Sequence, residues 1–517
     1  MKLAALPLAL GLVLALPAGA ALAADPHSGH DADTKAEVAT AIPAERDVVT
    51  HHVLRIDGTR LHYTAHAGTL LIHDDKGNAI GSMFYVAYVK DGVKDNSTRP
   101  VTFLYNGGPG SASLWMHMGS FGPKRVLTTN GGATPPPPYQ LVDNPDSLLD
   151  VSDLVFIDAM GTGFSRPVGK GTDKDFWGVD QDATAFDKFI TRYVTVNQRW
   201  NSPKFLYGES YGTTRSAALV DKLQNDGMAF NGVILMSSIL NYGELLPGMD
   251  RESIGNLPSY AAIAAYHHKI ALPPGGLPEL LNQARAFADT EYTEALAKGD
   301  TLPAAQKAAI AAKLSALTGL STTWLLEANL RIDPSRFQKE LLRDRRLTIG
   351  RYDARFTGID SDAAGETTET DPSDTGMSGA FTAAFNQYLT SDLNYHSDRS
   401  YLTMSNAIES WDWKHRAAGN GWKVPMPYVV GDLGEAIRSN PHLHVLSANG
   451  WYDLATPFHA TEYDLAHLGL EPSQMGQLQY TYYPSGHMIY LNPQALHQLK
   501  HDLVGFYHQA APTAGKP

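Results

Sequence analysis

Ser210 is the residue whose surroundings best suit nucleophilic chemistry. A short apolar run, residues 205–207, leads into Gly208-Glu209-Ser210-Tyr211-Gly212 and then into an apolar segment at 217–220. A Gly-x-Ser-x-Gly turn between a strand and a helix is the setting in which a serine hydroxyl is presented to a substrate. Glycines are suited to the positions on both sides of the serine, because so sharp a turn brings backbone segments close together and leaves no room for side chains. The pentapeptide also recurs by chance, so the assignment depends on its partners.

An aspartate and a histidine follow Ser210, each just after a predicted strand. The strand at 443–447 leads to Asn449-Gly-Trp-Tyr-Asp453, and the strand at 478–483 leads to Ser485-Gly-His487. Serine, aspartate and histidine in this order, at the ends of strands of one sheet, match the triad of α/β-hydrolases. His487 is expected to take the serine proton, while a buried Asp453 fixes the imidazole tautomer. The alternatives are an ordinary polar histidine at a strand end and a turn aspartate.

A glycine-rich loop could stabilise the negative charge that develops when a serine attacks a carbonyl. The predicted strand 101–105 runs into Asn106-Gly-Gly-Pro-Gly110. Glycines let backbone N–H groups approach a substrate with no side chain between them. The second expected donor is the N–H of Tyr211, the residue after the nucleophile. A tight turn without a ligand is the alternative for this loop.

The elements that must position these residues alternate between strands and helices. Apolar strands at 101–105, 153–158, 205–207 and 233–237, with a helix at 179–193, indicate an α/β fold with a mostly parallel sheet flanked by helices. A hairpin of strands 68–72 and 82–89 is expected to open the sheet. The first part of the core is assigned to 47–240 and the second part to 431–510.

The alternation stops between these two parts, and residues 241–430 are interpreted as a large helical cap inserted into the core. Helices are predicted at 277–298, 304–317 and 322–330. An acidic stretch at 360–379 could bind calcium, but it lacks EF-hand spacing and is interpreted as a disordered loop. The cap is expected to line the substrate pocket, with Trp324 or Tyr352 as candidate lining residues. The side-chain preference of that pocket does not follow from the sequence.

The amino-terminal residues have the composition of an export signal. Residues 1–23 combine Lys2, an apolar stretch and a small-residue site at 21–23, which predicts a signal peptide and a periplasmic or secreted location in a bacterium. A membrane anchor is the alternative, although Pro7 and Gly11 interrupt the run. Residues 24–46 are interpreted as a polar leader. No stable membrane anchor is expected once the signal is removed.

Composition narrows the possible partners and chemistry. The chain of 517 residues has no cysteine, which excludes disulfides and a cysteine nucleophile. A net charge of −13 argues against nucleic acid as a partner, because phosphate binding needs a basic face. No metal or cofactor is predicted. A peptide substrate is expected, and the oligomeric state is left open.

Five blocks in one order resemble the serine carboxypeptidase family, peptidase family S10. They are Asn106-Gly-Gly-Pro-Gly110, Gly161-Thr-Gly-Phe-Ser165, Gly208-Glu-Ser-Tyr-Gly212, Asn449-Gly-Trp-Tyr-Asp453 and Ser485-Gly-His-Met488. The resemblance implies an α/β-hydrolase that removes a C-terminal amino acid through an acyl-enzyme and works best in acid. It makes Ser210, Asp453 and His487 the triad, and Gly108 and Tyr211 the oxyanion donors. It assigns Asn106 and Glu209 to the terminal carboxylate of the substrate.

The acid optimum has its own physical reason. Two carboxylates repel each other, so Glu209 can bind a substrate carboxylate only when it carries or shares a proton. The family's second glutamate of this network corresponds to Ser120, and Tyr490 replaces a proline that usually follows the His-Met block. Losing one carboxyl group predicts an optimum closer to neutral pH.

Three other functions remain open at this stage. A proline-iminopeptidase-like aminopeptidase shares the Gly-Gly-Pro-Gly loop, but usually has histidine and glutamine at the positions of Asn106 and Glu209. An esterase could use the same triad, since acyl transfer handles esters and amides alike. A non-catalytic binding protein could use the same scaffold. N-blocked dipeptides with a free C-terminus separate the carboxypeptidase from the aminopeptidase.

Overall fold

The computed structural model describes residues 40–511. The predicted signal peptide 1–23 and residues 24–39 of the predicted polar leader lie outside the described residues. Residues 40–511 all belong to one compact unit. The proposed division into core and cap is therefore a division within this unit, and its boundaries stay predictions.

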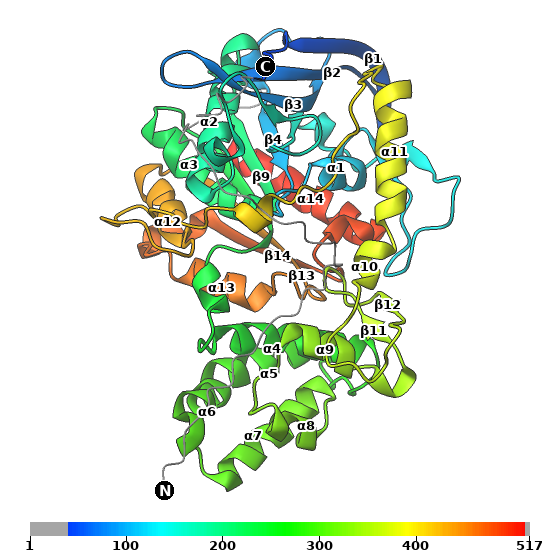
Figure 1. Ribbon diagram of the computed structural model, residues 1–517, viewed down its shortest axis with the longest axis vertical. Helices are drawn as coiled ribbons and strands as arrows, with labels where there is room; N and C mark the ends of the chain where they lie inside the picture. The colour runs from blue at the N-terminus through cyan, green and yellow to red at the C-terminus, as the bar shows by residue number, and fades with distance from the viewer. Residues whose placement is uncertain (1–39, 512–517) are drawn as a thin grey trace, which may run out of the picture. The chain divides into compact units, whose positions relative to one another are not determined.

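A ten-stranded mixed sheet positions the predicted site (Figure 1). Its strands lie in the order β1-β2-β3-β7-β4-β9-β10-β13-β14, and β8 pairs with β3. Every neighbouring pair from β7 to β14 is parallel, whereas β1, β2 and β3 pair antiparallel. The bounds are β1 Arg46–Ile56, β2 Thr59–His73, β3 Ala79–Lys90, β4 Val101–Tyr105, β7 Asp153–Ile157, β8 Arg166–Pro167, β9 Lys204–Ser210, β10 Gly232–Ser238, β13 His444–Gly450 and β14 Leu478–Tyr483.

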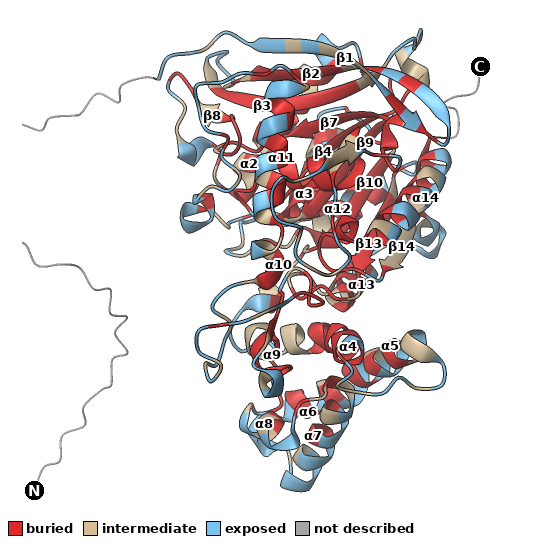
Figure 2. Ribbon diagram, turned by 90° about the vertical axis from the view of Figure 1, so that its right-hand side faces the viewer, coloured by how far each residue is buried: buried red, intermediate tan, exposed pale blue. Residues whose placement is uncertain are grey.

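Both faces of the sheet are buried, which explains its uninterrupted apolar strands. Along β4, Phe103 packs into one hydrophobic cluster and Leu104 into another, because successive side chains point to opposite faces. Helices α2 (Val179–Val196), α3 (Tyr211–Asn225) and α12 (Val430–Ser439) cover the Phe103 face. Helices α1 (Leu114–Met116), α11 (Ser378–Ser391) and α14 (Pro493–Ala510) cover the Leu104 face. Figure 2 shows the buried strands between these helices. The predicted mostly parallel sheet flanked by helices is confirmed.

The predicted hairpin at the start of the sheet is also confirmed. Strands β2 and β3 pair antiparallel, with Gly68 opposite Tyr85. In the turn between them, the Asp74 carboxylate accepts hydrogen bonds from the backbone N–H groups of Lys76 and Asn78 at 2.9 and 2.8 Å. An aspartate that holds its own turn in this way explains why Asp, Gly and Asn mark the turn in the sequence.

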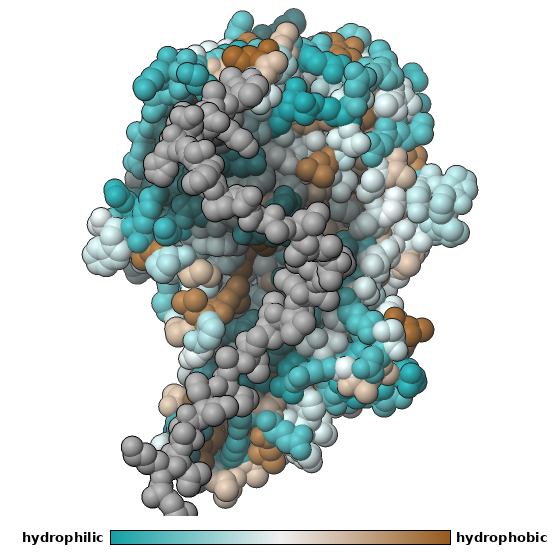
Figure 3. All heavy atoms as spheres, in the orientation of Figure 1, coloured by the Kyte–Doolittle hydropathy of each residue, from teal (hydrophilic) through white to brown (hydrophobic). Residues whose placement is uncertain are grey.

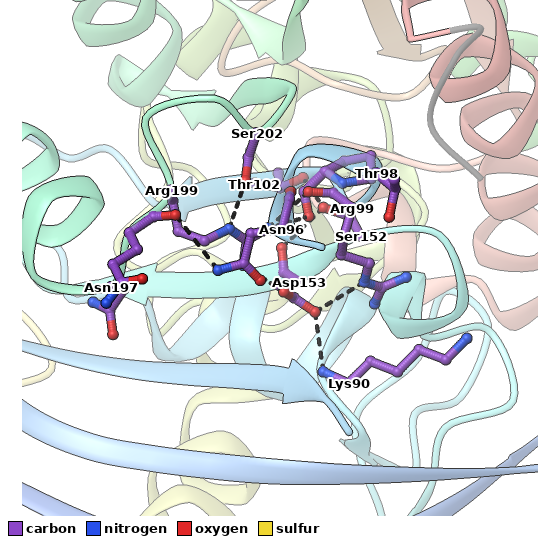
Figure 4. Close-up of polar contacts among 12 residues, drawn as sticks. Lys90, Asn96, Thr98, Arg99, Thr102, Ser152, Asp153, Asn197, Arg199 and Ser202 are labelled. Atoms are coloured by element: carbon purple, nitrogen blue, oxygen red, sulfur yellow. Dashed lines mark hydrogen bonds and ion pairs between the residues drawn. The ribbon is translucent and has the colours of Figure 1, made fainter. Parts of the chain in front are cut away.

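A buried ionic cluster ties together the amino ends of the central strands (Figure 4). Asp153 at the start of β7 accepts hydrogen bonds from Arg99 Nε at 3.0 Å and from Arg199 Nη1 at 2.5 Å. Its carboxylate also accepts the backbone N–H of Lys90 at 3.0 Å. The two guanidinium groups further donate to backbone carbonyls, including that of Leu149, and to the Ser202 hydroxyl. The cluster is buried and internally paired, so its role is structural.

Residues 241–430 are largely helical, in agreement with the sequence, and several of these helices share a hydrophobic cluster of their own. The predicted helix 304–317 is confirmed, and the predicted helix 277–298 forms as two α-helical segments joined by a five-residue π-helical turn, Ala288–Tyr292. The predicted helix 322–330 ends at Glu327. The helices are α4 Arg251–Tyr266, α5 Gly276–Phe287, α6 Thr293–Lys298, α7 Ala304–Thr318, α8 Thr322–Glu327, α9 Pro334–Glu340 and α10 Pro372–Thr375.

Two features of this region differ from the sequence-based expectation. Helix α4 was not predicted, because Pro258 lies in its interior and proline normally interrupts a helix. Helix α11, from the same region, packs with Phe381 and Phe385 against the core sheet. The sequence places α11 within the cap segment, but its apolar face contributes to the core.

The prediction of a disordered loop at 360–379 is wrong. The buried Asp360 forms an ion pair with Lys339 at 2.5 Å, and Arg343 donates to the carbonyls of Ala363 and Gly365. Helix α10 begins at Pro372 within the stretch, capped by the side chain of Asp371. Basic side chains of neighbouring elements hold this acidic segment, which composition alone could not reveal.

The face of the molecule drawn in Figure 3 is mainly polar where the described residues are visible. Figure 3 shows hydrophilic atoms over much of the visible face, with hydrophobic residues in small separate groups. In residues 40–511 no helix has both the length and the apolar character needed to cross a membrane.

Candidate active site

Ser210 lies at the junction of β9 and α3, as the sequence predicts. Strand β9 ends at Ser210 and helix α3 begins at Tyr211. The backbone of Ser210 has φ 60° and ψ −130°, a conformation that costs energy for a residue with a Cβ atom. A Cβ atom on Gly208 would lie 2.1 Å from the Gly212 carbonyl oxygen, so the turn requires glycine there. The tight turn leaves the Ser210 side chain partly exposed, facing a cavity.

Asp453 and His487 are hydrogen-bonded to each other at the same edge of the sheet. Asp453 Oδ2 accepts a hydrogen bond from His487 Nδ1 at 2.8 Å, and both side chains are almost fully buried. The backbone N–H groups of Ala455 and Thr456 donate to Asp453 Oδ1 at 2.7 and 3.0 Å, and the Thr456 hydroxyl donates to Oδ2 at 2.8 Å. A carboxylate held by this many donors keeps a fixed orientation, and it directs the other imidazole nitrogen away from Asp453.

The backbone of His487 is hydrogen-bonded to β10, the strand that pairs with β9, which carries Ser210. The Ser237 hydroxyl donates to the His487 carbonyl at 2.7 Å, and the His487 N–H donates to the Tyr352 carbonyl at 2.6 Å. Ser238, the next residue of β10, is the register partner of Ser210. Within residues 40–511 no hydrogen bond joins Ser210 Oγ to His487. Such bonds are often long in a free enzyme and shorten when substrate binds.

The electrostatics of His487 suit a general base. Burial acts to lower its pKa, but the charge and hydrogen bond of Asp453 outweigh burial and raise the pKa above the ordinary histidine value. A raised pKa strengthens the imidazole as a proton acceptor, and it also means that the ring is charged and inactive at low pH. The site can therefore take a proton from Ser210 once the pH exceeds this value.

The glycine-rich loop after β4 lies directly against the start of α3. A Cβ atom on Gly107 would lie 2.4 Å from the Tyr211 nitrogen and 2.7 Å from the Gly212 nitrogen. Gly108 has φ 105°, which favours glycine, and it lines the same cavity as Ser210. The loop of Gly108 and the N–H of Tyr211 are thus close to each other beside the nucleophile. This geometry suits the oxyanion role predicted for both residues.

Asn106 and Glu209 are buried beside Tyr490 and do not line the cavity. Tyr490 Oη donates to Glu209 Oε2 at 2.9 Å, and the Met116 N–H donates to Asn106 Oδ1 at 2.9 Å. Glu209 is only 1% exposed. Burial raises its pKa to about 7, although the charge of His487 and the hydrogen bond from Tyr490 oppose the rise. The carboxyl group therefore carries a proton below about pH 7.

Tyr490 is a residue whose contact the sequence did not reveal. It was recognised only as a departure from a usual proline, but its hydroxyl meets the Glu209 carboxyl group. A Cβ atom on Gly119 would lie 2.4 Å from the Tyr490 ring, so Gly119 makes room for that ring. Ser120, at the position of the family's second glutamate, instead donates to the Met116 carbonyl at 2.5 Å. The small residues at 119 and 120 beside a large residue at 490 are the signal that could have suggested this contact.

A cavity of about 380 Å³ opens beside Ser210. Residues of the segment 241–430 form much of its wall, as expected, including Tyr242, Asp333, Gln338 and Arg351. The expectation for Trp324 and Tyr352 is wrong, because neither lines this cavity. The Tyr352 ring lies 5.3 Å from the His487 ring and takes part in holding the base.

Comparison with known proteins agrees with this geometry. Helices on both faces of a mostly parallel sheet, with a nucleophile turn after a central strand, define an α/β-hydrolase. The sequence model of the serine carboxypeptidase family (Peptidase_S10) matches residues 57–268. Residues 57–268 are therefore similar to a serine carboxypeptidase domain, in agreement with the resemblance seen in the sequence blocks. No curated protein sequence matches the chain.

Similarity to a solved structure supports the fold. The chain is similar to Kex1, a prohormone-processing carboxypeptidase from Saccharomyces cerevisiae, with a TM-score of 0.51, 16% identity, and coverage of 86% of this chain and 91% of that chain. A proline iminopeptidase from Mycobacterium smegmatis matches with a TM-score of 0.35 and 12% identity over 90% of this chain and 100% of that chain. The second similarity is too low to support any argument.

Proposed function

We propose that this protein is an exported carboxypeptidase that releases the C-terminal amino acid of peptides through an acyl-enzyme on Ser210. The observation that carries the proposal is the buried Asp453–His487 hydrogen bond at the edge of the sheet where the strained turn presents Ser210. In this reaction His487 takes the proton of Ser210 as the hydroxyl attacks the scissile carbonyl, and returns it to the leaving amine. Water then attacks the acyl-enzyme by the same route, with His487 again as the base.

The charge that develops on the carbonyl oxygen needs donors that are already in place. The N–H groups of Gly108 and Tyr211 are proposed for this role, which is supported by the close approach of their loops. Asp453 holds the Nδ1–H tautomer of His487, so that Nε2 is free to accept the proton. No other protein group needs to change its charge during the cycle.

Asn106 and Glu209 are proposed to hold the terminal carboxylate of the substrate. Both side chains are buried in the free protein, so this contact requires them to become accessible when substrate binds. A protonated Glu209 can donate a hydrogen bond to a carboxylate, and a pKa of about 7 keeps it protonated over most of the acid range. The raised pKa of His487 limits the rate at low pH, while ionisation of Glu209 limits binding at high pH. We therefore expect an optimum close to neutral. A pH–rate maximum below about 5 would contradict this proposal.

The decisive experiment uses N-blocked dipeptides with a free C-terminus, with Ser210→Ala as the inactive control. Cleavage of these substrates and labelling of Ser210 by a fluorophosphonate are the expected results. Activity only on peptides with a free amino end would indicate an aminopeptidase. Activity on esters but not on peptides would indicate an esterase.

Export is proposed from the composition of residues 1–23. The expected mature protein begins near residue 24 and is recovered outside the cytoplasm of a bacterial host. Amino-terminal sequencing of the exported protein tests this. Recovery of uncleaved protein from the cytoplasm alone is the opposite outcome.

A further inference from the structure

A second group of polar side chains lies at the carboxyl edge of the sheet, on strands β3 and β8. Strand β3 pairs antiparallel with β7, with Tyr85 opposite Ile157, so Ser82 lies beyond the carboxyl end of β7. Ser82 is the register partner of Arg166 on β8. Directly opposed residues of an antiparallel pair point their side chains to the same face, so the Ser82 hydroxyl and the Arg166 guanidinium lie on one face of the sheet.

Two cavities that share part of their walls lie at this face. One of about 290 Å³, called the arginine cavity below, is lined by Arg46, Arg166 and Arg399 and also by Thr69 and Ser82. The other, of about 330 Å³, shares two of the arginines, Arg166 and Arg399. Neither has a lining residue in common with the cavity beside the nucleophile. Three arginines in one place are notable in a chain with a net charge of −13.

The three guanidinium groups have no carboxylate partner. Arg46 Nη1 donates to the His396 carbonyl at 2.9 Å, and its guanidinium lies over the Tyr395 ring at 4.2 Å from the ring centroid. Arg166 Nη1 makes only a long hydrogen bond of 3.4 Å to the Phe164 carbonyl. Within residues 40–511 none of the three arginines of the arginine cavity forms an ion pair. Their positive charge is therefore not neutralised by the described part of the chain.

The charges of Arg166 and Arg399 act on each other. Partial burial lowers the pKa of the Arg166 guanidinium, and the charge of Arg399 lowers it further. The carboxyl groups that line the two cavities are those of Asp173 and Asp398, which are exposed and form no ion pair within residues 40–511. A bound anion would relieve the repulsion between the arginines, because a nearby opposite charge favours the ionised form.

The arginine cavity also contains hydroxyl groups without an acceptor. Ser82 is only 1% exposed, and its Oγ makes no hydrogen bond within residues 40–511. Thr69 Oγ1 accepts the backbone N–H of Arg46 at 3.1 Å, while its own hydroxyl hydrogen has no acceptor among the described residues. Buried polar groups are nearly always paired, so these hydroxyl groups beside three guanidinium groups indicate an acceptor supplied by another molecule.

We propose that the arginine cavity binds a phosphate group, with Arg166 and Arg399 as charged donors and Ser82 as a hydroxyl donor. Guanidinium groups form paired hydrogen bonds with phosphate oxygens. A tetrahedral anion accepts hydrogen bonds from several directions, which suits donors on the sheet face and on the loop that carries Arg399. The phosphate is either free or the headgroup of a lipid, and the experiment distinguishes these sources. The inference is independent of the proposed peptidase function.

The segment that carries Arg399 also contacts the glycine-rich loop of the active site. The Ser405 N–H donates to the Gly110 carbonyl at 2.8 Å, and the Ala112 N–H donates to the Thr403 carbonyl at 3.0 Å. A ligand on Arg399 therefore adds a contact to a segment that is already packed on this loop. Because only the folded protein has the site, bound phosphate should raise the melting temperature.

The first test measures binding of inorganic phosphate to the full protein by calorimetry and by the shift in melting temperature, at constant ionic strength. Saturable binding is expected, with competition by sulfate and with acetate at least about 10-fold weaker, because a planar carboxylate meets fewer of the donors. Equal binding of acetate and phosphate would overturn the assignment of a tetrahedral anion.

The second test changes the donors. Arg166→Gln and Arg399→Gln should each weaken phosphate binding by at least about 10-fold, because charged hydrogen bonds are lost. Ser82→Ala should weaken it by about 3- to 10-fold without lowering the melting temperature in the absence of phosphate, since the hydroxyl has no partner in the described protein. Arg60→Gln is the matched control, because Arg60 is exposed on β2 and lines neither cavity.

Circular dichroism verifies that each variant is folded, and Arg399→Ala on the exposed loop substitutes for an arginine variant that is not. Phosphate affinity that is unchanged in the folded arginine variants, or reduced equally in Arg60→Gln, would overturn the inference.

The third test separates free phosphate from a lipid headgroup. Phosphatidylcholine vesicles with and without phosphatidic acid are mixed with the wild type and with Arg166→Gln. Recruitment to the phosphatidic acid vesicles that is lost in the variant assigns the site to a lipid phosphate, whereas binding of inorganic phosphate without recruitment assigns it to the free anion. If the wild type binds neither, or if the variant is recruited as well as the wild type and inorganic phosphate does not bind, the inference is overturned.

Discussion

The two edges of the central sheet differ in how their buried charges are paired. At the amino edge, Asp153 is enclosed by Arg99 and Arg199, and the guanidinium groups donate further to backbone carbonyls. At the carboxyl edge, Asp453 and His487 are paired, but Asn256 Oδ1 and Ser238 Oγ make no hydrogen bond within residues 40–511. Both edges bury charged groups, yet only one leaves hydrogen-bonding capacity for another molecule.

Whether a buried polar group has a partner within the protein distinguishes a structural role from a functional one more clearly than its burial or its residue type does. A buried charge whose partners all belong to the protein stabilises one arrangement of strands, and its loss should cost stability. A buried polar atom without a partner, beside a strained serine, lowers stability, and a bound molecule can offset that cost. The two edges should therefore respond to substitution through different measurements.

Ser210→Ala should produce the largest effect. Removal of the nucleophile is expected to lower kcat by about 10⁶-fold, while the free energy of unfolding changes little. Relief of the strain at φ 60° is not expected, since alanine also carries a Cβ atom. Peptide turnover and chemical denaturation measure the two quantities. Turnover within tenfold of the wild type would place the nucleophile elsewhere.

Asp453→Asn should follow, with a loss of about 10⁴-fold in kcat. The asparagine keeps the shape of the side chain but favours the wrong imidazole tautomer, so His487 no longer offers a free nitrogen to Ser210. KM should change less than kcat, because Asp453 does not touch the substrate. A loss confined to KM would contradict the assigned role.

Asp153→Ala tests the opposite edge. Leaving two buried guanidinium groups without their carboxylate should lower the free energy of unfolding by about 3–5 kcal/mol, while kcat of the folded fraction stays near the wild-type value. Asp344→Ala, which breaks the exposed Lys269–Asp344 pair, is the matched control and should have little effect. If kcat fell without a loss of stability, Asp153 would have a functional rather than a structural role, and the proposed difference between the two edges would be wrong.

Much of the core could be predicted because its signals are local. Strand β4 and the turn at Ser210 are recognisable from runs of apolar residues and from glycines that only tight backbones require. Asp453 and His487 could be named because each follows a strand of the same sheet. The five sequence blocks that resemble the serine carboxypeptidase family then supported the assignment of these two residues to the triad.

The remaining features depend on contacts between residues distant in sequence. The Glu209–Tyr490 hydrogen bond joins positions 281 residues apart, and the order of the 360–379 segment depends on Lys339 and Arg343. Helix α4 was missed because local propensity argues against a proline that packing tolerates. The cavity beside Ser210 is formed by three-dimensional packing of both core and cap residues, so no single motif encodes it.

Tyr490→Phe should give the smallest effect and refine the comparison at the carboxyl edge. The Tyr490 hydrogen bond stabilises the ionised form of Glu209, against the burial that raises its pKa to about 7. Without that bond the pKa of Glu209 should rise further, by up to about one unit, since the bond is worth about 0.5–1.5 kcal/mol. The pH at which KM for N-blocked dipeptides begins to increase should therefore move upward, with kcat little changed. Tyr480→Phe, at an exposed tyrosine of β14, is the control. A KM profile that is unchanged in Tyr490→Phe would mean that Glu209 does not hold the substrate carboxylate, and that the carboxyl edge contains a buried acid whose role is structural after all.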